Sequence, residues 1–401
     1  AERSHGVTID LAHKVVETAT KVVTIVDAPG HADFVPRMIA GAMTADVGLL
    51  VVAATDFEAG FSSGGQTKEH ALLLKSLGVH QVLVAVNKMD ATAPEPYSRE
   101  RFDTVASLIV DFLTETCKFA PDKVRVVPVS AFTGDNVARK LPGSPLRDSP
   151  AWGHPTAGPA GGLTLVEAMD AFKAPPRAFC KPLRILLSDV SPAGKGVSAT
   201  GQVISGEVDV GQPLVARPSN DRSLVKQLMS SPEGAPLAFA SAGDAVQLVL
   251  PELDPLRVSA GDVLCSLAPR EGLERPLVPV ARKFEARLTT LAALKVPLIK
   301  GAQVVLHVGL TEVAANVSKL VCLLNAAGQV ARARPRALGP SSGAVVQVTC
   351  ERAICVEPKP TQATAQGTAP GDRPAAASPL ARFVLRQQGT TVAAGLITAV
   401  L

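Results

Sequence analysis

The first motif that could do chemistry is DAPGH (27–31), which follows the apolar run VVTIVD and precedes a helix-like segment. A carboxylate at the end of a buried strand can hold a magnesium ion through water, and a neighbouring glycine lets a backbone N–H approach a terminal phosphate. Asp27 and Gly30 would fill these roles, and His31 would face the attacking water. Taken alone, the motif is better explained as a strand-end turn with a surface histidine, because short motifs recur by chance.

The second motif, NKMD (87–90), follows the apolar run QVLVAV. The carboxylate of Asp90 can accept hydrogen bonds from both N1–H and the exocyclic amine of guanine, and adenine lacks both donors in that arrangement. Asn87 can bridge the base and neighbouring loops, while the aliphatic stem of Lys88 can cover the face of the ring. By itself, NKMD fits a polar turn equally well.

Two weaker signals complete the set. Ser130 and Ala131 follow a third apolar run, where a backbone N–H could meet the guanine carbonyl oxygen. Thr8, in HGVTID, offers a hydroxyl of the kind that ligates magnesium when a switch segment closes over a nucleoside triphosphate, although an exposed strand threonine is the simpler explanation. The order of all four signals, each beside an apolar run, makes coincidence remote and predicts a site for GTP and Mg²⁺.

The elements that must position these residues alternate between apolar runs and amphipathic segments, a pattern typical of an α/β domain with a largely parallel sheet. Apolar residues recur at helical spacing over 66–77 and 99–117, and Thr164 with Glu167 predicts a capping box. The motifs should then meet at one rim of the sheet. Four near-continuous apolar runs are typical of strands covered on both faces: 22–27, 47–54, 81–86 and 124–129.

After Pro175-Pro176 the sequence changes to short alternating strands broken by Gly, Pro, Asn and Asp, which predicts antiparallel β-barrels. We therefore expect a GTP-binding domain at 1–176 and two barrels at 177–270 and 271–401. Two tracts rich in Pro, Gly, Ala and Thr, 141–162 and 358–379, are predicted to be surface insertions, the second within a barrel.

The bulk composition excludes several classes of protein. No apolar run reaches the roughly 18 residues that a membrane span needs, so we expect a cytoplasmic protein with no membrane partner. The six cysteines include no CxxC pair, which argues against a zinc site or a disulfide framework. With aromatic residues at 3%, stacking on bases cannot be the main way of binding nucleic acid, so any RNA contact should involve phosphates.

At this point a family resemblance is clear. The segments ERSHGVTID, DAPGHADFVPRMI, GGQTKEHALLLKSLGV, NKMD and RFVLRQQGTTVAAGLITAV resemble the elongation-factor-one-alpha superfamily of translational GTPases over nearly the whole chain. Within it, VPLIKGAQVVLHVG (296–309) and SKLVCLLN (318–325) are most similar to the HBS-one-like branch, the ribosome-rescue GTPases that partner Pelota. Termination and elongation GTPases, which carry a release factor or aminoacyl-tRNA, are the nearest alternatives.

The resemblance implies a GTPase that hydrolyses GTP to GDP and phosphate. It implies that the barrels bind a tRNA-shaped partner, here a Pelota-like factor, and deliver it to stalled ribosomes in ribosome rescue and messenger-RNA surveillance. A monomer in contact with ribosomal RNA is expected. The implied site residues are Thr8 and Asp27 for magnesium, Gly30 for the γ-phosphate, His31 for the catalytic water, and Asn87, Lys88, Asp90, Ser130 and Ala131 for guanine.

One part of the family pattern is missing. GxxxxGK[ST] occurs nowhere, and AGKG (193–196) lies in the first predicted barrel without the leading Gly, the spacing or the hydroxyl residue. The fold class expected is therefore a P-loop-type α/β G domain, N-terminally truncated and lacking its first strand and P-loop, followed by two antiparallel β-barrels. A shortened sequence is one explanation. The other is a partner-binding module that has lost the ability to bind nucleotide.

A basic feature lies outside these motifs. Arg332, Arg334 and Arg336 alternate in QVARARPRAL, so on a strand all three would project from one face. A solvated edge strand protected from aggregation by charge and by Pro335 is the simpler explanation. Contact with ribosomal RNA or with the partner is the functional one.

Overall fold

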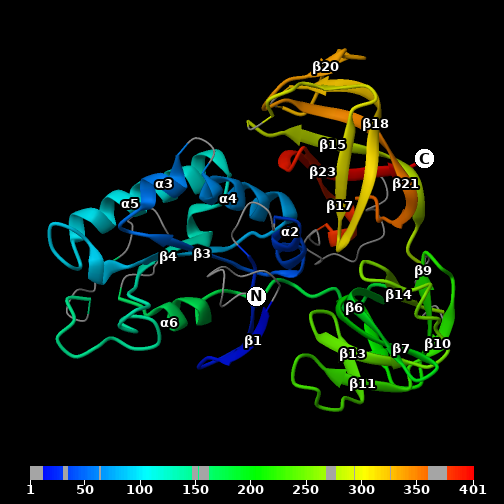
Figure 1. The fold of residues 1–401 in the computed structure, drawn as a ribbon, viewed down its shortest axis with the longest axis horizontal. Helices are drawn as coiled ribbons and strands as arrows, with labels where there is room; N and C mark the ends of the chain where they lie inside the picture. Colours follow the sequence, from blue (N-terminus) through cyan, green and yellow to red (C-terminus); the bar gives the residue numbers. More distant parts are fainter. Residues whose placement is uncertain are drawn as a thin grey trace. The chain divides into compact units, whose positions relative to one another are not determined.

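The computed structural model describes residues 12–29, 35–62, 65–146, 152, 162–267, 277–292, 294–325, 327–359 and 377–401. The chain divides into two compact units, the first ending at Pro175 and the second beginning at Pro176 (Figure 1). This division coincides with the change of sequence pattern at Pro175-Pro176. Each unit is described by itself.

The first unit is built on a parallel three-stranded sheet in the order β3-β4-β5. Its strands are β3 (Gly48–Ala53), β4 (Val82–Asn87) and β5 (Val124–Pro128). Leu50 pairs with Val84, and Val84 pairs with Val126, so β-branched and leucine side chains stack across the sheet. Because the strands are parallel, the segments that follow them all leave from one edge.

Helices cover both faces of this sheet, as expected for an α/β domain (Figure 1). On one face, Phe102, Val105 and Ile109 of α5 pack against β4 and β5, and on the other Ala168 of α6 packs against Leu83. The predicted capping box of Thr164 and Glu167 is confirmed at the start of α6. The helices are α2 (Val35–Thr44), α3 (Phe57–Phe61), α4 (Gln66–Leu77), α5 (Arg99–Asp111, followed by a π-helical turn, Phe112–Thr116) and α6 (Leu165–Asp170).

The prediction that 141–162 is a surface insertion is wrong for two of its residues. Leu146 and Trp152 are 2% and 6% exposed and belong to the core on the α5 side of the sheet. The Trp152 ring meets Phe102 edge to face at a centroid distance of 5.3 Å, and the Arg99 guanidinium lies over it. Burial of a large aromatic side chain outweighs the loop-like composition around it.

The apolar run 22–27 forms a strand, but it lies outside the parallel sheet. β1 (Ala12–Glu17) and β2 (Val22–Asp27) form an antiparallel hairpin that pairs with no other described strand. Val22 is 70% exposed, and on β3 the side chains of Leu49 and Val51 are 39% and 57% exposed. The prediction that these runs are covered on both faces is therefore wrong, because in the described part of the chain β3 is an edge strand packed on one side only.

The second unit begins with an antiparallel seven-stranded sheet in the order β10-β9-β14-β6-β7-β13-β11, which curves around its own apolar core. The AGKG sequence forms the tight turn between β6 and β7, where Gly194 has a φ of 63°. A short β8–β12 pair lies beside the sheet. The strands are β6 (Arg184–Ala193), β7 (Gly196–Ser205), β8 (Glu207–Asp209), β9 (Pro213–Arg217), β10 (Arg222–Leu224), β11 (Gln227–Ser230), β12 (Phe239–Ser241), β13 (Ala245–Leu250) and β14 (Val263–Ser266).

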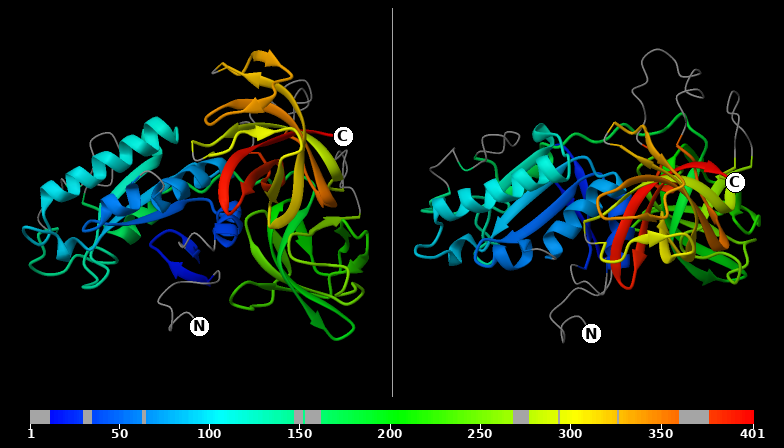
Figure 2. Two further views of the ribbon diagram at one scale, coloured as in Figure 1. Left: turned by 45° about the horizontal axis from the view of Figure 1, so that its top comes forward. Right: turned by 90° about the horizontal axis from the view of Figure 1, so that it is seen from above.

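The remaining strands close into a six-stranded barrel, which confirms the second of the two predicted barrels. The ring runs β17-β22-β23-β15-β21-β18 and returns to β17, around a core that includes Phe284 and Phe383. Figure 2 shows these yellow, orange and red strands from two further sides. β19 pairs with β18 at the margin, and β16 pairs with β20. The strands are β15 (Val280–Thr290), β16 (Leu298–Ile299), β17 (Gln303–Val308), β18 (Thr311–Leu324), β19 (Val330–Ala333), β20 (Ala337–Leu338), β21 (Gly343–Cys355), β22 (Arg382–Gln387) and β23 (Thr390–Val400).

The prediction of three arginines on one face of a continuous strand is wrong. β19 ends at Ala333, and Arg334 has a φ of 46°, because the segment must leave the sheet edge before Pro335. Arg336 then lies just before β20. Arg332, Arg334 and Arg336 all remain exposed, but they do not form a single row.

An apolar cluster joins the two sets of strands within the second unit. It combines Leu186 and Cys265 of the first set with Cys355 and Leu380 of the second. A partly buried ion pair between Arg184 Nε and Glu357 Oε1, 2.9 Å apart, lies at the same junction. Such pairs add little net stability by themselves, but breaking one leaves an uncompensated charge.

Asp262, in the turn before β14, should make stability depend on pH. Burial raises the pKa of its carboxyl to about 6, although the Ser259 N–H and Arg352 favour the charged form. The pKa of Asp262 is higher in the folded protein than in the unfolded chain. The stability that its neutral carboxyl contributes is therefore fully present below about pH 4 and is lost as pH rises through about 6. Asp262→Asn should raise the free energy of unfolding at pH 8 by about 1–2 kcal/mol, since water and Arg352 screen part of the charge.

Urea unfolding at pH 4, 6 and 8 tests this expectation. The difference between D262N and the original chain should grow with pH, and Asp244→Asn, an exposed turn carboxylate of the same unit, should show no such growth. A pH-independent difference would show that the charge of Asp262 is not what costs stability.

Candidate nucleotide-binding site

The ends of β4 and β5 bring together two of the predicted motifs. The Ala131 backbone N–H donates to the side-chain oxygen Oδ1 of Asn87 at 2.9 Å, and the carbonyl of Asn87 accepts from the Ala54 N–H at 2.8 Å. Asn87 therefore connects the segments that follow β3 and β5 to the end of β4. These contacts agree with the predicted bridging of neighbouring loops, and the predicted contact of Asn87 with a base stays a prediction.

Asp90 and Ser130 form the second contact between the same two motifs. The Ser130 hydroxyl donates to Oδ1 of Asp90 and accepts from the Thr133 N–H at 3.2 Å. Ser130 is fully buried, whereas Asp90 is half-buried. In the described part of the chain no hydrogen bond or ion pair occupies Oδ2 of Asp90, so this oxygen can accept from a ligand. The carboxylate is thus held in place by a neighbour that leaves half of it available.

The backbone shape of the NKMD motif is also special. Lys88 has a φ of 62°, in the left-handed region that is uncommon for a residue other than glycine. Such a conformation turns the chain sharply between the strand end and the short 3₁₀ turn Met89–Ala91. Strained backbone of this kind clusters at functional sites, where the surrounding structure enforces it.

The predicted contact from the Ser130-Ala131 backbone to a guanine carbonyl is not preformed. The Ser130 N–H donates to the carbonyl of Asp135 at 3.1 Å, and the Ala131 N–H donates to Asn87. A guanine carbonyl could bind the Ala131 N–H only by sharing or replacing the Asn87 acceptor.

Sequence reasoning missed Asp56. Its carboxylate lies 3.5 Å from the ammonium of Lys88, and both side chains are exposed. The signal that could have found it is its position, because TDFEAG follows β3 as NKMD follows β4. The segment is fixed by Arg101, which donates to the Ala54 carbonyl and forms a bidentate pair with Glu58. The hydrogen bond from Arg101 is the main reason that the pKa of Glu58 is lowered to about 2.

The metal and phosphate half of the predicted site is less defined. Asp27 is the last residue of β2 and is exposed, and Thr8, Gly30 and His31 lie outside the described residues. No hydrogen bond or ion pair between described residues joins Asp27 to Asn87, Asp90 or Ser130. Its carboxylate is a hard oxygen donor, which suits a magnesium ion bound through water.

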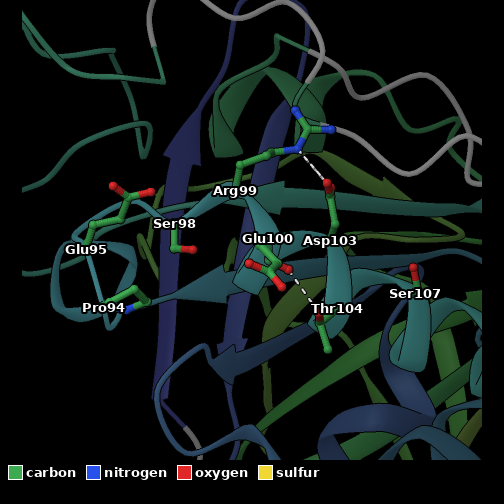
Figure 3. A pocket seen from close by; sticks show the side chains of 8 residues that line it. All are labelled: Pro94, Glu95, Ser98, Arg99, Glu100, Asp103, Thr104 and Ser107. Atoms are coloured by element: carbon green, nitrogen blue, oxygen red, sulfur yellow. Dashed lines mark hydrogen bonds and ion pairs between the residues drawn. The ribbon is translucent and has the colours of Figure 1, made fainter.

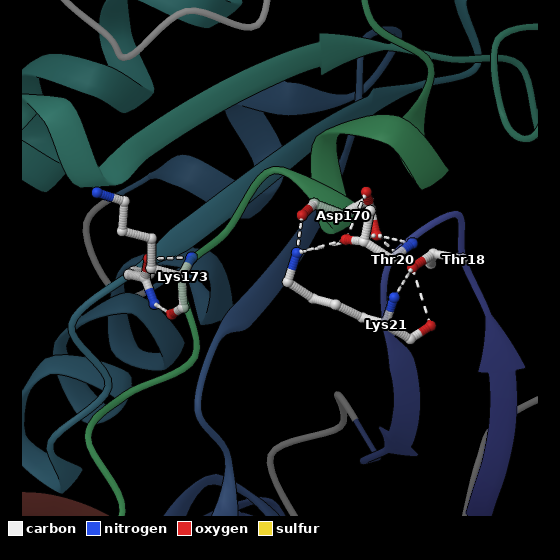
Figure 4. A network of polar contacts seen from close by, with 6 residues as sticks. Thr18, Thr20, Lys21, Asp170 and Lys173 are labelled. Carbon is white, nitrogen blue, oxygen red and sulfur yellow. Dashed lines mark hydrogen bonds and ion pairs between the residues drawn. The ribbon is translucent and has the colours of Figure 1, made fainter.

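A polar network fixes the opposite end of the hairpin that carries Asp27 (Figure 4). Asp170, at the end of α6, accepts from the hydroxyls of Thr18 and Thr20 and from the Thr20 N–H at 3.1 Å. Lys21 adds a hydrogen bond to the Asp170 carbonyl and a 3.9 Å ion pair. The Thr18 hydrogen bond is the main reason that the pKa of the Asp170 carboxyl is lowered. Among the described residues, this turn is the hairpin's polar attachment to the rest of the unit.

We predict that Asp170→Ala loosens the hairpin without unfolding the domain. Amides of 12–27 should exchange with deuterium roughly tenfold faster. In the original chain, local opening of the hairpin must break its hydrogen bonds to Asp170, and in the variant it need not. Amides of β4 and β5 should keep their protection. The matched control is Asp103→Ala, which removes an exposed carboxylate from α5. Unchanged exchange in the hairpin would mean that Asp170 does not hold it.

A hollow on the exposed side of α5 is a separate feature (Figure 3). Its lining includes Glu95, Glu100 and Asp103, together with Arg99, whose guanidinium is already paired with Asp103 at 2.9 Å. The hollow is open to solvent and contains none of the predicted site residues. We assign it no ligand.

The described residues contain no cluster of three or more His, Cys, Asp or Glu side chains placed to hold a metal ion. None of their helices has both the length and the apolar character that crossing a membrane requires.

Comparisons with known proteins agree with this geometry. Residues 1–175 match the family model described as elongation factor Tu GTP binding domain, and residues 283–398 match the GTP-eEF1A C-terminal domain-like family. The chain is 35% identical to Protein HBS1 of Drosophila melanogaster over 401 residues, which is 99% of this chain and 54% of that protein. It is 34% identical to elongation factor 1-alpha of Staphylothermus marinus, over 99% of this chain and 82% of that protein.

Solved structures share the fold. The Saccharomyces cerevisiae Ski7 GTPase-like domain, bound to GTP, has a TM-score of 0.72 at 16% identity and covers 99% of this chain and 84% of its own. The elongation factor SelB of Methanococcus maripaludis, in complex with a GTP analogue, has a TM-score of 0.67 at 20% identity, over 98% of this chain and 74% of its own. At these identities the likeness extends to the fold alone.

Proposed function

The chain belongs to the elongation factor 1-alpha family of translational GTPases, and from that premise we propose that it carries a tRNA-shaped protein to stalled ribosomes and is released on GTP hydrolysis. The observation that carries the nucleotide part is the meeting of NKMD with Ser130-Ala131, through the Asn87–Ala131 and Asp90–Ser130 hydrogen bonds. Two loops 40 residues apart in sequence thereby form one polar surface.

In this proposal the guanine base binds at that surface. The free oxygen of Asp90 accepts from the base, and the stem of Lys88 covers the ring. Asn87 keeps the Ser130-Ala131 loop beside it, and the Ala131 N–H, shared with the Asn87 side chain, is the donor for the guanine carbonyl. A base without the two donors that Asp90 reads would leave a half-buried carboxylate unpaired, which is the physical origin of selectivity.

The triphosphate end is assigned to the remaining predicted residues. Asp27 and Thr8 would hold magnesium, Gly30 would approach the γ-phosphate, and His31 would orient the attacking water. Magnesium, when bound, neutralises charge that develops on the phosphate oxygens. Asp27 ends β2 of the hairpin, which is attached to Asp170 at its opposite end.

The rescue role is supported by similarity to Protein HBS1, of which the chain spans about half the length. By this proposal the cargo is a Pelota-like factor, the target is the ribosome, and the protein works in the cytoplasm as a monomer. Elongation and termination GTPases share the same fold and would differ only in cargo. Similarity of 34% to an elongation factor 1-alpha makes the elongation role the leading alternative.

A binding competition separates these roles. The chain is immobilised and offered purified Pelota, a release factor and aminoacyl-tRNA at equal concentration. Retention of Pelota in preference to both others is expected. Retention of aminoacyl-tRNA or of the release factor instead would replace rescue by elongation or termination.

A second candidate function is a partner-binding module that does not use nucleotide. One observation favours it, namely that GxxxxGK[ST] is absent from the sequence. GTP hydrolysis stimulated by ribosomes would exclude this candidate, and partner binding without any hydrolysis would support it.

A further inference from the structure

A buried carboxylate lies in the loop that follows β5 and carries Ser130 and Ala131. Asp135 is fully buried, and in the described part of the chain it forms no ion pair with a basic residue. A charge buried in this way is costly unless hydrogen bonds replace the water that it has lost. The partners of the Asp135 side chain therefore indicate what the carboxylate does.

Two hydrogen bonds join this carboxylate to a later segment of the chain. Oδ1 of Asp135 accepts from the Leu141 backbone N–H at 3.0 Å, and Oδ2 accepts from the hydroxyl of Ser144. The Ser144 oxygen accepts in turn from the Leu146 N–H at 3.1 Å. Leu146 is buried in the core on the α5 side of the sheet. Through Ser144, the carboxylate is thus attached to a segment that the core fixes.

The backbone of Asp135 holds the part of the loop that precedes it. The Asp135 carbonyl accepts from the Ser130 N–H at 3.1 Å, and the Asp135 N–H donates to the hydroxyl oxygen of Thr133 at 3.3 Å. Ser130 donates its own hydroxyl to the carboxylate of Asp90. Hydrogen bonds therefore connect the core to the candidate base-binding carboxylate in one series: Leu146, Ser144, Asp135, Ser130 and Asp90.

The next residue attaches the same loop to the rest of the domain independently of that carboxylate. The Asn136 side-chain amide donates to the carbonyl of Pro128, at the end of β5, at 2.8 Å and to the carbonyl of Leu163, before α6, at 3.3 Å. The Asn136 carbonyl accepts from the Leu165 N–H at 2.9 Å. These bonds remain when the Asp135 side chain is shortened, so we expect the loop to shift and the domain to stay folded.

We propose that Asp135 is a positioning residue for guanine binding, which acts through Ser130 on the carboxylate of Asp90. The inference rests on the proposed function, in which Asp90 and the Ala131 N–H bind the base. Groups that read a ligand by hydrogen bonds must be held within about 0.5 Å of their productive positions. A buried carboxylate suits this task, because it accepts two hydrogen bonds that are each stronger than those to a neutral acceptor.

Titrations with guanosine and adenosine, followed by nuclear magnetic resonance, test the proposal. Asp135→Ala should weaken guanosine binding at least about tenfold and bring the ratio of guanosine to adenosine affinity close to one. Asp135→Asn should stay within about threefold of the original chain, because its side chain can still accept from Leu141 and donate to Ser144. The matched control, Ser98→Ala, removes a buried capping hydroxyl at the start of α5 and should lower the melting temperature without changing the ratio.

Hydrogen exchange of the Ser130 amide, measured without nucleotide, shows separately whether the loop has been released. Exchange should be roughly tenfold faster in Asp135→Ala and unchanged in Ser98→Ala. A guanosine affinity in Asp135→Ala equal to that of the original chain would overturn the inference alone. So would an equal loss of the affinity ratio in Ser98→Ala. No guanosine binding by the original chain would overturn the proposed function, and the inference with it.

A second variant carries the test if Asp135→Ala does not fold. Ser144→Ala removes the hydroxyl that donates to the same carboxylate and leaves the Leu141 hydrogen bond in place. The ratio of guanosine to adenosine affinity should fall in this variant, by less than in Asp135→Ala. An unchanged ratio in Ser144→Ala would show that Asp135 has no part in placing Asp90.

Discussion

The chain with this sequence should bind GTP with a dissociation constant of about 1 mM or weaker. Binding of a triphosphate depends on backbone N–H groups and a lysine that cradle its phosphates, and the motif that supplies them is absent. Each charge-assisted contact contributes about 1.5–3 kcal/mol, so losing three of them converts micromolar binding to millimolar or weaker.

Titration of a fluorescent GTP analogue measures this directly. We expect no saturation up to about 100 µM protein, since a millimolar site is mostly empty at that concentration. The same analogue of ATP is the control for non-specific binding. Saturable micromolar binding of the GTP analogue would show that another segment replaces the phosphate cradle.

Asp90→Ala should remove the preference for guanine that the remaining half of the site retains. The carboxylate is the group that reads two donors of guanine, and its loss should weaken binding of guanosine at least about tenfold. Because binding is expected to be weak, nuclear magnetic resonance at millimolar guanosine is the suitable measurement. The amides of 87–91 and 130–131 should shift in the original chain and not in the variant.

The control for this experiment is Asp56→Ala. It also removes a carboxylate beside Lys88, but among the described residues no hydrogen bond or ion pair joins Asp56 to Asp90 or Ser130. Guanosine binding should change less than threefold in this variant. Equal shifts with adenosine and guanosine in the original chain would contradict the assignment of Asp90.

Local sequence signals predicted the parallel strands, the main helices and the meeting of NKMD with Ser130-Ala131. They succeeded because a strand buried on both faces needs a continuous apolar run, and parallel strands must end at one edge. Val84 and Val126, fully buried in register, follow this rule. Val22 and Val51 do not follow this rule, because both lie in apolar runs and are nevertheless exposed. Whether another element covers a strand cannot be read from its local sequence.

Other features depended on contacts that sequence patterns do not contain. The burial of Trp152 is decided by Phe102, 50 residues away, and not by the Pro- and Gly-rich tract around it. The attachment of Thr18 and Thr20 to Asp170 joins positions about 150 residues apart. The same holds for the ion pair of Asp56 with Lys88, which forms only because β3 and β4 are neighbours.

The central claim is that short loops from distant parts of the chain bind one guanine nucleotide at one rim of a sheet. A crystal structure of the chain grown with millimolar GDP and magnesium tests it most directly. We expect the base between the Lys88 stem and the Ser130-Ala131 loop, hydrogen-bonded to Asp90, with the phosphates extending toward Asp27. A base bound elsewhere, or Asp27 and Asp90 opening onto different surfaces of the unit, would contradict it.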